Sequence, residues 1–371
     1  MEIQLTNVPD QMGVRPNWCD LPSELWRKIG KSLRNRIDLL RFRSVCNSWR
    51  SSIPPSLPNS PSFPLQLPHP INPFTVVFLI QSTFYRIEPP YQPSSSSPKG
   101  WLIKVEGESN PSHSHPLRLL NPLSDRQFSN PLSSSPRILN LLDYRVLELY
   151  KSYCFQQFGF PVKKVVFFPT SCWSDGEDSV ACCIYLEGKL ALFKRGDKKW
   201  TLVDDENYYY DDVIVYKGQL YVTDRWGTIS WVDISSLKLI QYSPPLCGVG
   251  HKKHLVELCG NLYVIDRYYD SEPRRLNYEA AVVDFKVYRL DEEWGTWVDV
   301  KDLEDRVFIL GDSCSFSVSA NDFAGYEGNC IFFTDMFDVG KYNLGDGSIK
   351  TFELDPCSSK LFWPPPSWLR M

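Results

Sequence analysis

The sequence predicts a mainly β protein, in which a small three-helix module precedes a C-terminal β-propeller of about six or seven irregular blades. Three observations support this prediction: a short helical pattern near the start, a strand-forming segment that recurs in the second half, and frequent aromatic and proline residues, with 12 Trp, 19 Tyr, 21 Phe and 29 Pro in 371 residues. Such a composition favours turn-punctuated β-structure over a helical bundle. We divide the chain into a disordered N-terminus at 1–17, the helical module at 18–55, a proline-rich linker at 56–73 and the propeller at 74–371.

The helical module is defined by the spacing of apolar residues between Trp18 and Ile53. Leu25, Ile29 and Leu33 recur every four residues, which places them on one face of a helix of 3.6 residues per turn. Pro22 leads into this helix, since a proline in the first turn lacks only an amide hydrogen that would have no intrahelical partner. Further apolar residues step by three or four and predict two more short helices: Leu39, Phe42, Cys46, Trp49 and Ile53.

This module is too small to bury its apolar face alone. Its helical segment from Trp18 to Ile53 has 36 residues, and chains below roughly 40 residues usually need a disulfide, a metal or a partner to fold stably. It carries eight Lys or Arg against three acidic residues, a net charge of +5, so the remainder of this chain of net charge −4 carries −9. We therefore expect another surface to cover the module, and an acidic partner would complement its charge.

The order of residues in the module resembles the F-box, a motif that docks on a Skp-type adaptor within cullin ubiquitin ligases. The resemblance rests on these positions: Leu21-Pro22, Ile29, Leu33, Asp38-Leu39-Leu40-Arg41, Arg43, Val45-Cys46 and Trp49-Arg50. Asn47 departs from it, standing where family members commonly have Lys. The resemblance implies that the following residues contact the adaptor: Leu21, Pro22, Leu25, Ile29, Leu33, Leu39, Val45 and Trp49.

Two other interpretations of the module stay open. In the first, the helices are an ordinary cap packed on the following domain. In the second, they form a basic DNA-binding unit, because eight cations lie near Phe42 and Trp49. The second is weakened by the spread of Lys and Arg around the helices, which reserves no single face for a groove.

The segment after the module reads as a stiff spacer. Pro54 to Pro73 contains eight prolines in twenty residues, which removes backbone donors and favours extended polyproline geometry. Such a spacer would hold two modules at a set separation.

Composition limits the compartment and the partners. The N-terminus shows no signal peptide, and the longest apolar run, Phe74 to Ile80, is seven residues, far below the ~18 of a membrane span. Eleven scattered cysteines and the absence of an Asn-x-Ser/Thr sequon favour reduced thiols inside the cell. The residues leave nucleus and cytoplasm open, and the family resemblance favours the nucleus. A net charge of −4 points to neither nucleic acid nor membrane as a partner.

A repeat in the second half predicts the propeller. The segment Gly218 to Trp226, GQLYVTDRW, returns 42 residues later as GNLYVIDRY at Gly260 to Tyr268, and a looser copy begins at Gly328. Units of three or four strands recurring every ~40 to 50 residues are typical of propeller blades. The longer gap before the third copy predicts an insertion around 271–279. A β-sandwich with coincidental repeats is the alternative.

The β region also resembles the C-terminal domain of unknown function found in many plant F-box proteins. The pattern KGQLYVTD, followed by a strand and a Trp-containing strand, carries this resemblance over most of residues 74–360. Together the two resemblances imply a substrate receptor, with a Skp-type adaptor and through it a cullin as partners, and an unknown protein as substrate.

One surface of the propeller is expected to bind the substrate. The pairs Asp224-Arg225 and Asp266-Arg267 occupy equivalent places in the repeat, and Tyr and Arg contribute most at binding hot spots. The candidate substrate-binding residues are Tyr209, Asp224, Arg225, Trp226, Asp266 and Arg267. The alternative is that the aspartates cap blade turns and the arginines are solvated.

No catalytic, cofactor or metal site is predicted. Four residues have side chains that could bind zinc, but their spacing matches no common zinc pattern: Cys247, His251, His254 and Cys259. An acidic cluster around Tyr208 to Tyr210 reads as a solvated interblade loop: Asp204, Asp205, Glu206, Asp211 and Asp212. A carboxylate pair there would suit a glycosidase, so a carbohydrate-binding propeller or propeller enzyme is the alternative function. We therefore expect a non-catalytic receptor subunit of a ubiquitin ligase.

Overall fold

The computed structural model describes two compact units, residues 1–58 and 59–371, which are presented separately. The described residues are 21–33, 36–53, 63–72, 74–88, 99–106, 118–125, 140–156, 159, 161–168, 179–204, 209–270, 281–335 and 338–352. The expected disordered N-terminus at 1–17 and the expected insertion at 271–279 lie outside them.

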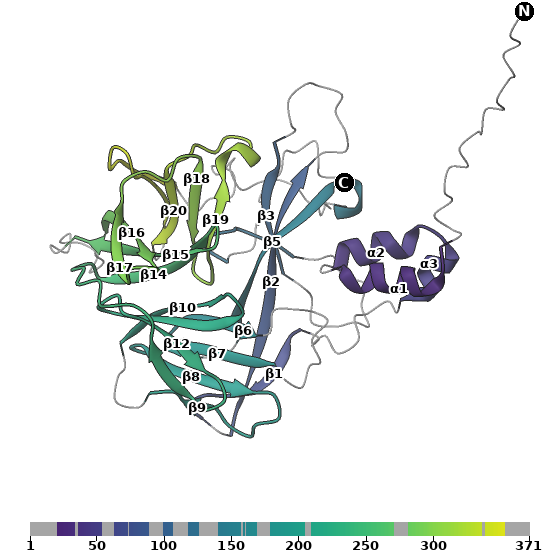
Figure 1. The fold of residues 1–371 in the computed structure, drawn as a ribbon, viewed down its shortest axis with the longest axis horizontal. Helices are drawn as coiled ribbons and strands as arrows, with labels where there is room; N and C mark the ends of the chain where they lie inside the picture. The colour runs from purple at the N-terminus through teal and green to yellow at the C-terminus, as the bar shows by residue number, and fades with distance from the viewer. Residues whose placement is uncertain are drawn as a thin grey trace, which may run out of the picture. The chain divides into compact units, whose positions relative to one another are not determined.

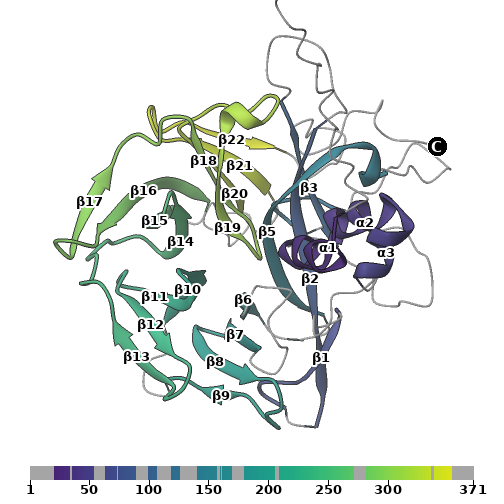
Figure 2. The same cartoon turned by 45° about the vertical axis from the view of Figure 1, so that its right-hand side comes forward.

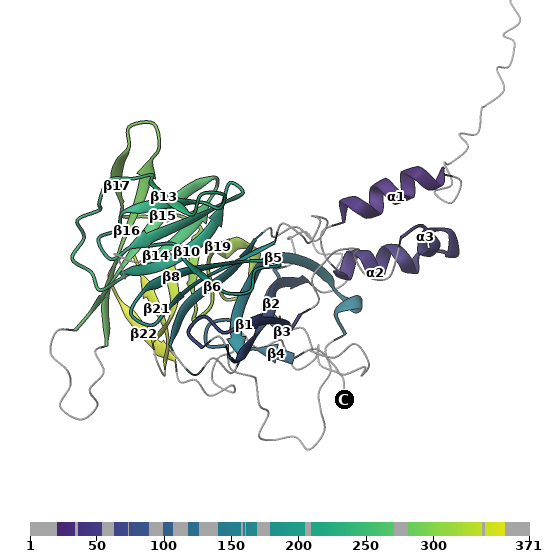
Figure 3. The same cartoon turned by 90° about the horizontal axis from the view of Figure 1, so that it is seen from below.

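The first unit contains the three predicted helices (Figures 1 and 3). They are α1 (Ser23–Ser32), α2 (Arg36–Ser44) and α3 (Asn47–Ser52). Pro22 precedes α1 in an extended conformation, and its carbonyl accepts the amide hydrogens of Leu25 and Trp26. The proline therefore marks the helix start, as the sequence predicts.

A small aromatic core holds the helical unit together. The rings of Phe42 and Trp49 lie 4.5 Å apart, and those of Trp26 and Trp49 lie 6.4 Å apart. Ile53 is buried against Gly30 of α1, where a Cβ atom would fall 1.4 Å from the Ile53 Cδ1. The glycine thus permits the close approach of the chain after α3 to α1.

The second unit is built mainly from antiparallel strands. Its first sheet has nine strands: β1 (Leu65–Pro68), β2 (Val76–Glu88), β3 (Trp101–Glu106), β4 (Arg118–Leu120), β5 (Arg145–Gln156), β6 (Val162–Phe168), β7 (Val180–Tyr185), β8 (Lys189–Lys194) and β9 (Thr201–Leu202). A short 3-10 helix, Leu141–Asp143, precedes β5. One registered pair, Tyr153 with Val165, joins β5 to β6. The sheet therefore divides into a group around the long strands β2 and β5 and a four-stranded group β6 to β9.

Two four-stranded sheets and one five-stranded sheet follow. The four-stranded sheets are β10 (Tyr210–Tyr216), β11 (Gln219–Asp224), β12 (Ile229–Asp233), β13 (Lys238–Gln241), then β14 (Lys252–Leu258), β15 (Asn261–Tyr269), β16 (Val282–Asp291) and β17 (Thr296–Val300). The last sheet has the order β19 (Ser315–Ser319), β18 (Arg306–Leu310), β20 (Cys330–Asp335), β21 (Asp338–Asn343) and β22 (Ile349–Phe352). The pair β18 and β20 is parallel, and a 3-10 helix, Ala320–Asp322, lies between β19 and β20.

The sequence repeat marks the same hairpin in two consecutive sheets. Lys217-Gly218 joins β10 to β11, and Cys259-Gly260 joins β14 to β15, with φ of 46° and 78° in the first turn and 51° and 77° in the second. Two positive φ angles in a two-residue loop define the turn type that matches the twist of paired strands. Glycine recurs at the second position because it adopts this conformation without steric cost.

The sheets are arranged around a common centre, as in a β-propeller (Figure 2). The inner strands contact one another near the centre in the order β6, β10, β14 and β19. Strands β9, β13 and β17 lie at the periphery. The mainly β class, the propeller-like arrangement and the preceding helices agree with the sequence prediction.

The described strands show fewer blades than the six or seven predicted. They form four hydrogen-bonded sheets, and because the first divides into two groups, they make up five groups of strands. The reason lies at the start of the unit, where β2 and β5 have 13 and 12 residues and pair along most of their length. An estimate from repeat spacing assumes short strands throughout, so it overcounts where long strands replace them.

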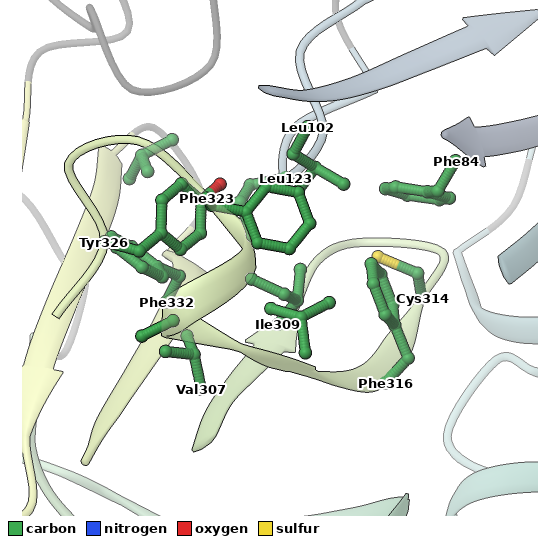
Figure 4. Close-up of a cluster of buried hydrophobic side chains, with 13 residues drawn as sticks. Phe84, Leu102, Leu123, Val307, Ile309, Cys314, Phe316, Phe323, Tyr326 and Phe332 are labelled. Atoms are coloured by element: carbon green, nitrogen blue, oxygen red, sulfur yellow. The ribbon is translucent and has the colours of Figure 1, made fainter. Parts of the chain in front are cut away.

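The ring closes by packing of the first strands against the last sheet (Figure 4). Phe84 of β2 is fully buried, and its ring lies 4.9 Å from that of Phe316 in β19. Lys104 of β3 donates to the Ser313 hydroxyl at 3.1 Å and pairs with Asp125. Backbone hydrogen bonds from Gly100 to the Asp322 carbonyl and from Asp312 to the Leu123 carbonyl add to this closure.

The segment 56–73, predicted to be a linker, contains strand β1, so the prediction is wrong for residues 65–68. Residues 65–68 pair with β2, and Leu67 and His69 are buried. A proline-rich segment can still supply an edge strand, because an edge uses only part of its backbone hydrogen bonds. The second compact unit accordingly begins at Asn59, well before the predicted boundary at 74.

Among the described residues, no helix has both the length and the apolar character needed to cross a membrane.

Candidate functional site

The helical unit exposes apolar side chains beside its core. Leu25 and Ile29 lie one turn apart on the same side of α1 with 45% and 37% of their surface exposed, and Val45 after α2 is 55% exposed. Leu21 and Leu33 are half-buried and Pro22 is exposed. These predicted contact residues are therefore available to a partner as far as the unit itself is concerned.

Two predicted adaptor contacts take part in the core of the unit. Leu39 is only 1% exposed, so its side chain cannot insert into another protein, and that assignment is wrong. Trp49 is half-buried and packs against Phe42, with the two rings tilted by 37°. The neighbour Leu40, which the sequence analysis did not select, is 40% exposed. Adjacent helical residues point about 100° apart, so only one of a Leu-Leu pair can face inward.

Part of the positive charge of the helical unit is used internally. Arg43 donates to the carbonyls of Arg50 and Ile53, and the Arg50 Nε donates to the Arg43 carbonyl at 3.2 Å. Arg41 lies 3.5 Å from Asp38. These contacts satisfy carbonyls at the ends of α2 and α3. They give these arginines a structural role, whereas a DNA-binding interpretation would need them to contact DNA.

The β unit carries a polar pocket of about 310 Å³ on its face. Its lining comes from the starts of inner strands and the turns beside them: Lys163, Glu187, Tyr209, Asp211, Arg225 and His251. Lys163 belongs to β6 and Asp211 to β10, while His251 precedes β14. The pocket therefore forms where three consecutive sheets meet.

Two residues that line the pocket form a partly buried ion pair. The Lys163 Nζ lies 2.7 Å from the Asp211 Oδ1 and donates to the Tyr210 carbonyl at 2.9 Å. The second Asp211 oxygen accepts the amide hydrogen of Lys253 at 3.1 Å. Lys163 and Asp211 thus hold each other in place, and both carboxylate oxygens of Asp211 have a partner.

The rim of the pocket carries an exposed aromatic pair. Tyr209 and Trp226 are 45% and 50% exposed, and their rings meet edge to face at 5.7 Å. The Arg225 guanidinium lies 5.9 Å from the centre of the Tyr209 ring. Three of the predicted substrate-binding residues are therefore gathered at one place.

Asp224 positions this rim without forming part of it. Its Oδ1 accepts the amide hydrogens of Trp226 at 2.9 Å and Thr228 at 2.8 Å, which closes the turn between β11 and β12. Burial raises the pKa of the Asp224 carboxyl above its usual value. The turn-capping alternative for this aspartate agrees with these contacts.

The second copy of the Asp-Arg pair is buried, so its assignment to a binding surface is wrong. Asp266 is fully buried and lies 2.7 Å from the Lys253 ammonium, and Arg267 donates to the Thr334 carbonyl at 2.6 Å. The Arg267 guanidinium also faces the rings of Phe285 and Phe333. In the first copy the strand ends at Asp224, whereas β15 continues to Tyr269 and keeps the second copy inside the sheet.

At Asp211 and Asp212, the acidic cluster is not the solvated loop that the sequence predicts. Asp211 and Asp212 are 6% and 2% exposed, and Asp212 pairs with Lys164 at 2.8 Å and accepts the amide hydrogen of Leu255 at 2.8 Å. A register shift between Tyr210 and Asp212 marks a β-bulge that re-aims adjacent side chains. Both carboxylates are held by lysines, an arrangement unlike a glycosidase pair. Asp205 and Glu206 lie outside the described residues.

The residues weighed as zinc ligands do not gather. His251 Nδ1 accepts the amide hydrogen of Tyr269 at 3.2 Å, while His254 is buried and Cys259 lies in an exposed turn. Across the described part of the chain, no group of three or more His, Cys, Asp or Glu side chains is placed to hold a metal ion.

A small helical module and a β-propeller define the class of protein, and comparison with known proteins names its family. Residues 76–353 match the family model described as the KIB1-4 beta-propeller. The F-box protein SKIP23 of Arabidopsis thaliana is 34% identical, with 95% of each chain covered. The F-box proteins At2g17036 and At4g35733 of the same plant are each 30% identical, covering 95% and 90% of this chain and 95% and 93% of theirs.

The chain therefore belongs to the plant F-box proteins that carry a KIB1-4 beta-propeller, which confirms the family resemblance seen in the sequence. Among solved structures, a Synechocystis apocarotenoid oxygenase matches with a TM-score of 0.30 and 10% identity, over 80% of this chain and 83% of that chain. A similarity of this size says nothing about function.

Proposed function

We propose that this protein is the substrate-recognition subunit of an SCF-type ubiquitin ligase. The helical unit binds a Skp-type adaptor and through it a cullin, and the propeller binds the protein to be ubiquitinated. The proposal is supported chiefly by the exposed apolar residues Leu25, Ile29 and Val45 on a unit of only three short helices, in a chain of the F-box family.

In this proposal the chain performs no chemistry of its own. Ubiquitin transfer is accelerated because a bound substrate is held near the transferring enzyme, which raises the effective concentration of the two reactants. No catalytic constellation is assigned to the propeller, since the carboxylates near its centre are paired with lysines. We expect the protein to act in the nucleus, in line with its family.

A pull-down with a purified Skp-type adaptor tests the first half of the proposal. Wild-type protein is expected to retain the adaptor, and the double variant Leu21→Ala/Pro22→Ala is expected to lose it. Leu202→Ala, a substitution at a 40% exposed leucine of the β unit, is the matched control and should bind like wild type. If wild-type protein retains no adaptor, the ligase function is rejected.

A reconstituted ubiquitination reaction tests the second half. Proximity labelling in plant cells under proteasome block, compared between wild type and the adaptor-binding variant, supplies the proteins to assay. A substrate is expected to be ubiquitinated only when adaptor, cullin and this protein are all present. Equal modification without this protein would contradict the receptor function.

A further inference from the structure

The pocket on the β unit has unused hydrogen-bond donors. Lys163 and Asp211 satisfy each other, as described above. Among the described residues, Arg225 and Glu187 form no ion pair, although both line the pocket and are exposed. The guanidinium of Arg225 offers five N–H donors in a flat arrangement that suits a carboxylate or phosphate.

His251 adds a donor of defined position. Its Nδ1 accepts the Tyr269 amide hydrogen, so in the neutral ring the proton resides on Nε2. Together with Arg225 and the remaining Lys163 hydrogen, the pocket presents donors from three side chains. Among the charged acceptors that line the pocket, Asp211 is engaged by Lys163 and the Lys253 amide, whereas no described partner engages the carboxylate of Glu187. The balance of donors over acceptors favours an anionic group.

The aromatic pair beside the pocket supplies a place for an apolar neighbour. The Asp224 carboxylate holds the amide of Trp226, the carbonyl of Tyr209 accepts the amide hydrogen of Arg225 at 2.8 Å, and both aromatic side chains remain about half exposed. Large aromatic side chains and arginine dominate binding energy at protein interfaces, where one apolar anchor and one charged contact often lie side by side. Exposed aromatics of this kind are otherwise unfavourable in water.

We propose that this pocket binds an acidic side chain of an extended peptide segment, with the adjacent apolar side chain of that segment resting on Tyr209 and Trp226. The anionic group is a carboxylate or a phosphate, held by Arg225 and His251. Glu187 repels a doubly charged group more than a singly charged one, which favours the carboxylate. This inference rests on the proposed function, since it names the chemistry of the segment that the receptor would recognise.

Peptide pools test the proposal directly. The probes are fluorescent nonapeptides with degenerate flanks and a central Asp, Glu, phosphoserine, Asn or Lys, and their binding to the full-length protein is measured by fluorescence anisotropy. The Asp and Glu pools are expected to bind at least about ten-fold more tightly than the Asn and Lys pools, as for a charged hydrogen-bonded contact. A phosphoserine pool that binds tightest assigns the phosphate as the source of charge. Equal binding of all pools, or preference for Lys, overturns the proposal.

Substitutions at Arg225 and at Glu187 distinguish the contribution of the positive side chain from that of the negative one. Arg225→Ala is expected to abolish the preference for acidic pools, whereas Glu187→Gln is expected to strengthen acidic binding two- to five-fold, roughly the effect of one rim charge. Arg195→Ala, at an exposed arginine outside the pocket, is the control. Weaker acidic binding in Glu187→Gln would contradict the repulsion assigned to Glu187 and overturn the proposed arrangement of charges.

The aromatic contribution has its own matched pair. Trp226→Ala should weaken binding of the acidic pools, while Trp294→Ala, at a 75% exposed tryptophan of the β16–β17 hairpin, should not. Adaptor binding is measured on the same preparations. Acidic preference without adaptor binding would leave the pocket standing and remove the ligase, and adaptor binding without acidic preference would remove the pocket alone.

Discussion

Asp-Arg occurs twice at the same place in the repeat, yet only the first copy reaches solvent. Arg225 stands at a pocket rim, whereas Asp266 and Arg267 are enclosed in the sheet. The difference arises because β11 stops at Asp224 while β15 runs on to Tyr269. Identical residues therefore lie beside a pocket in one blade and inside the sheet in the next.

This contrast predicts that substitution lowers the free energy of unfolding much more at the buried copy than at the exposed copy. Asp266→Ala leaves the fully buried Lys253 ammonium without its partner, and such a loss costs about 3–5 kcal/mol of unfolding free energy. Arg225→Ala, at the exposed copy, should change stability by no more than about 0.5 kcal/mol. Urea denaturation followed by fluorescence measures both. Comparable stability losses in the two variants would contradict the assignment.

His254 predicts a pH dependence of stability. Burial holds the pKa of this imidazole well below its usual value, and nearby cations, Lys252 first, lower it further. The unfolded histidine has a pKa of about 6.5, so the unfolded state takes up a proton first as the pH falls and the native state loses stability. The loss approaches ~1.4 kcal/mol per pH unit below about pH 6.

The comparison with His254→Gln isolates this effect from other titrations. The difference in unfolding free energy between wild type and variant should be constant above about pH 7.5 and should shift in favour of the variant as the pH falls to 5. Urea denaturation at each pH gives the curve. Parallel stability curves across this range would show that His254 does not titrate on unfolding.

At the scale of elements, two adjacent leucines of α2 face different surroundings: Leu39 lies in the core of the helical unit, and Leu40 is exposed. Leu39→Ala should destabilise the helical unit by about 2–5 kcal/mol, because a buried leucine leaves a cavity. Leu40→Ala should leave the unit folded and lower the affinity for a Skp-type adaptor. Amide hydrogen exchange in α1 to α3 reports the first effect and calorimetric titration the second. The reverse pattern would show that α2 faces the other way.

Periodicity and turn chemistry made several elements predictable. The spacing of Leu25, Ile29 and Leu33 predicts α1, and the recurring Gly218 and Gly260 predict the hairpins of two blades. Long-range packing was not predictable. The exposure of Leu40 instead of Leu39, the β1 strand inside a proline-rich segment and the extension of β15 each depend on which neighbour covers a residue, and local spacing carries no information about that.

The candidate site was predictable only in part. Tyr and Arg in a repeat pointed to Tyr209, Arg225 and Trp226, which the structure brings together. Lys163, Glu187 and His251 join them from separate strands and turns. These three residues lie far from Arg225 in the chain, so no local pattern in the sequence links them to it. The sequence offers only the general rule that the starts of inner strands meet at one face of a propeller.

For the whole β unit, closure of the ring is the feature on which stability depends. Phe84 near its beginning packs on Phe316 near its end, and both lie in one buried cluster with Val307 and Phe332 (Figure 4). Contacts between distant parts of the chain make unfolding cooperative, since neither end can leave without exposing the other.

This arrangement predicts that Phe84→Ala destabilises β2 and β20 together. A buried phenylalanine truncated to alanine costs about 3–5 kcal/mol. Hydrogen exchange should therefore accelerate in strands at both ends of the unit. Phe74→Ala, at a 94% exposed phenylalanine, is the control and should leave exchange unchanged. Faster exchange confined to β2 would show that the two ends unfold independently.

The most direct measurement of adaptor docking is the affinity of a purified Skp-type adaptor for the full-length protein, determined by calorimetric titration. Leu25→Glu places a charge on a 45% exposed leucine of α1, and Leu147→Glu does the same on a 48% exposed leucine of β5. Wild type and Leu147→Glu are expected to bind equally, and Leu25→Glu at least about a hundred-fold more weakly, as for a charge buried in an apolar interface. Unchanged affinity in Leu25→Glu, or an equal loss in both variants, would contradict docking through the helical unit.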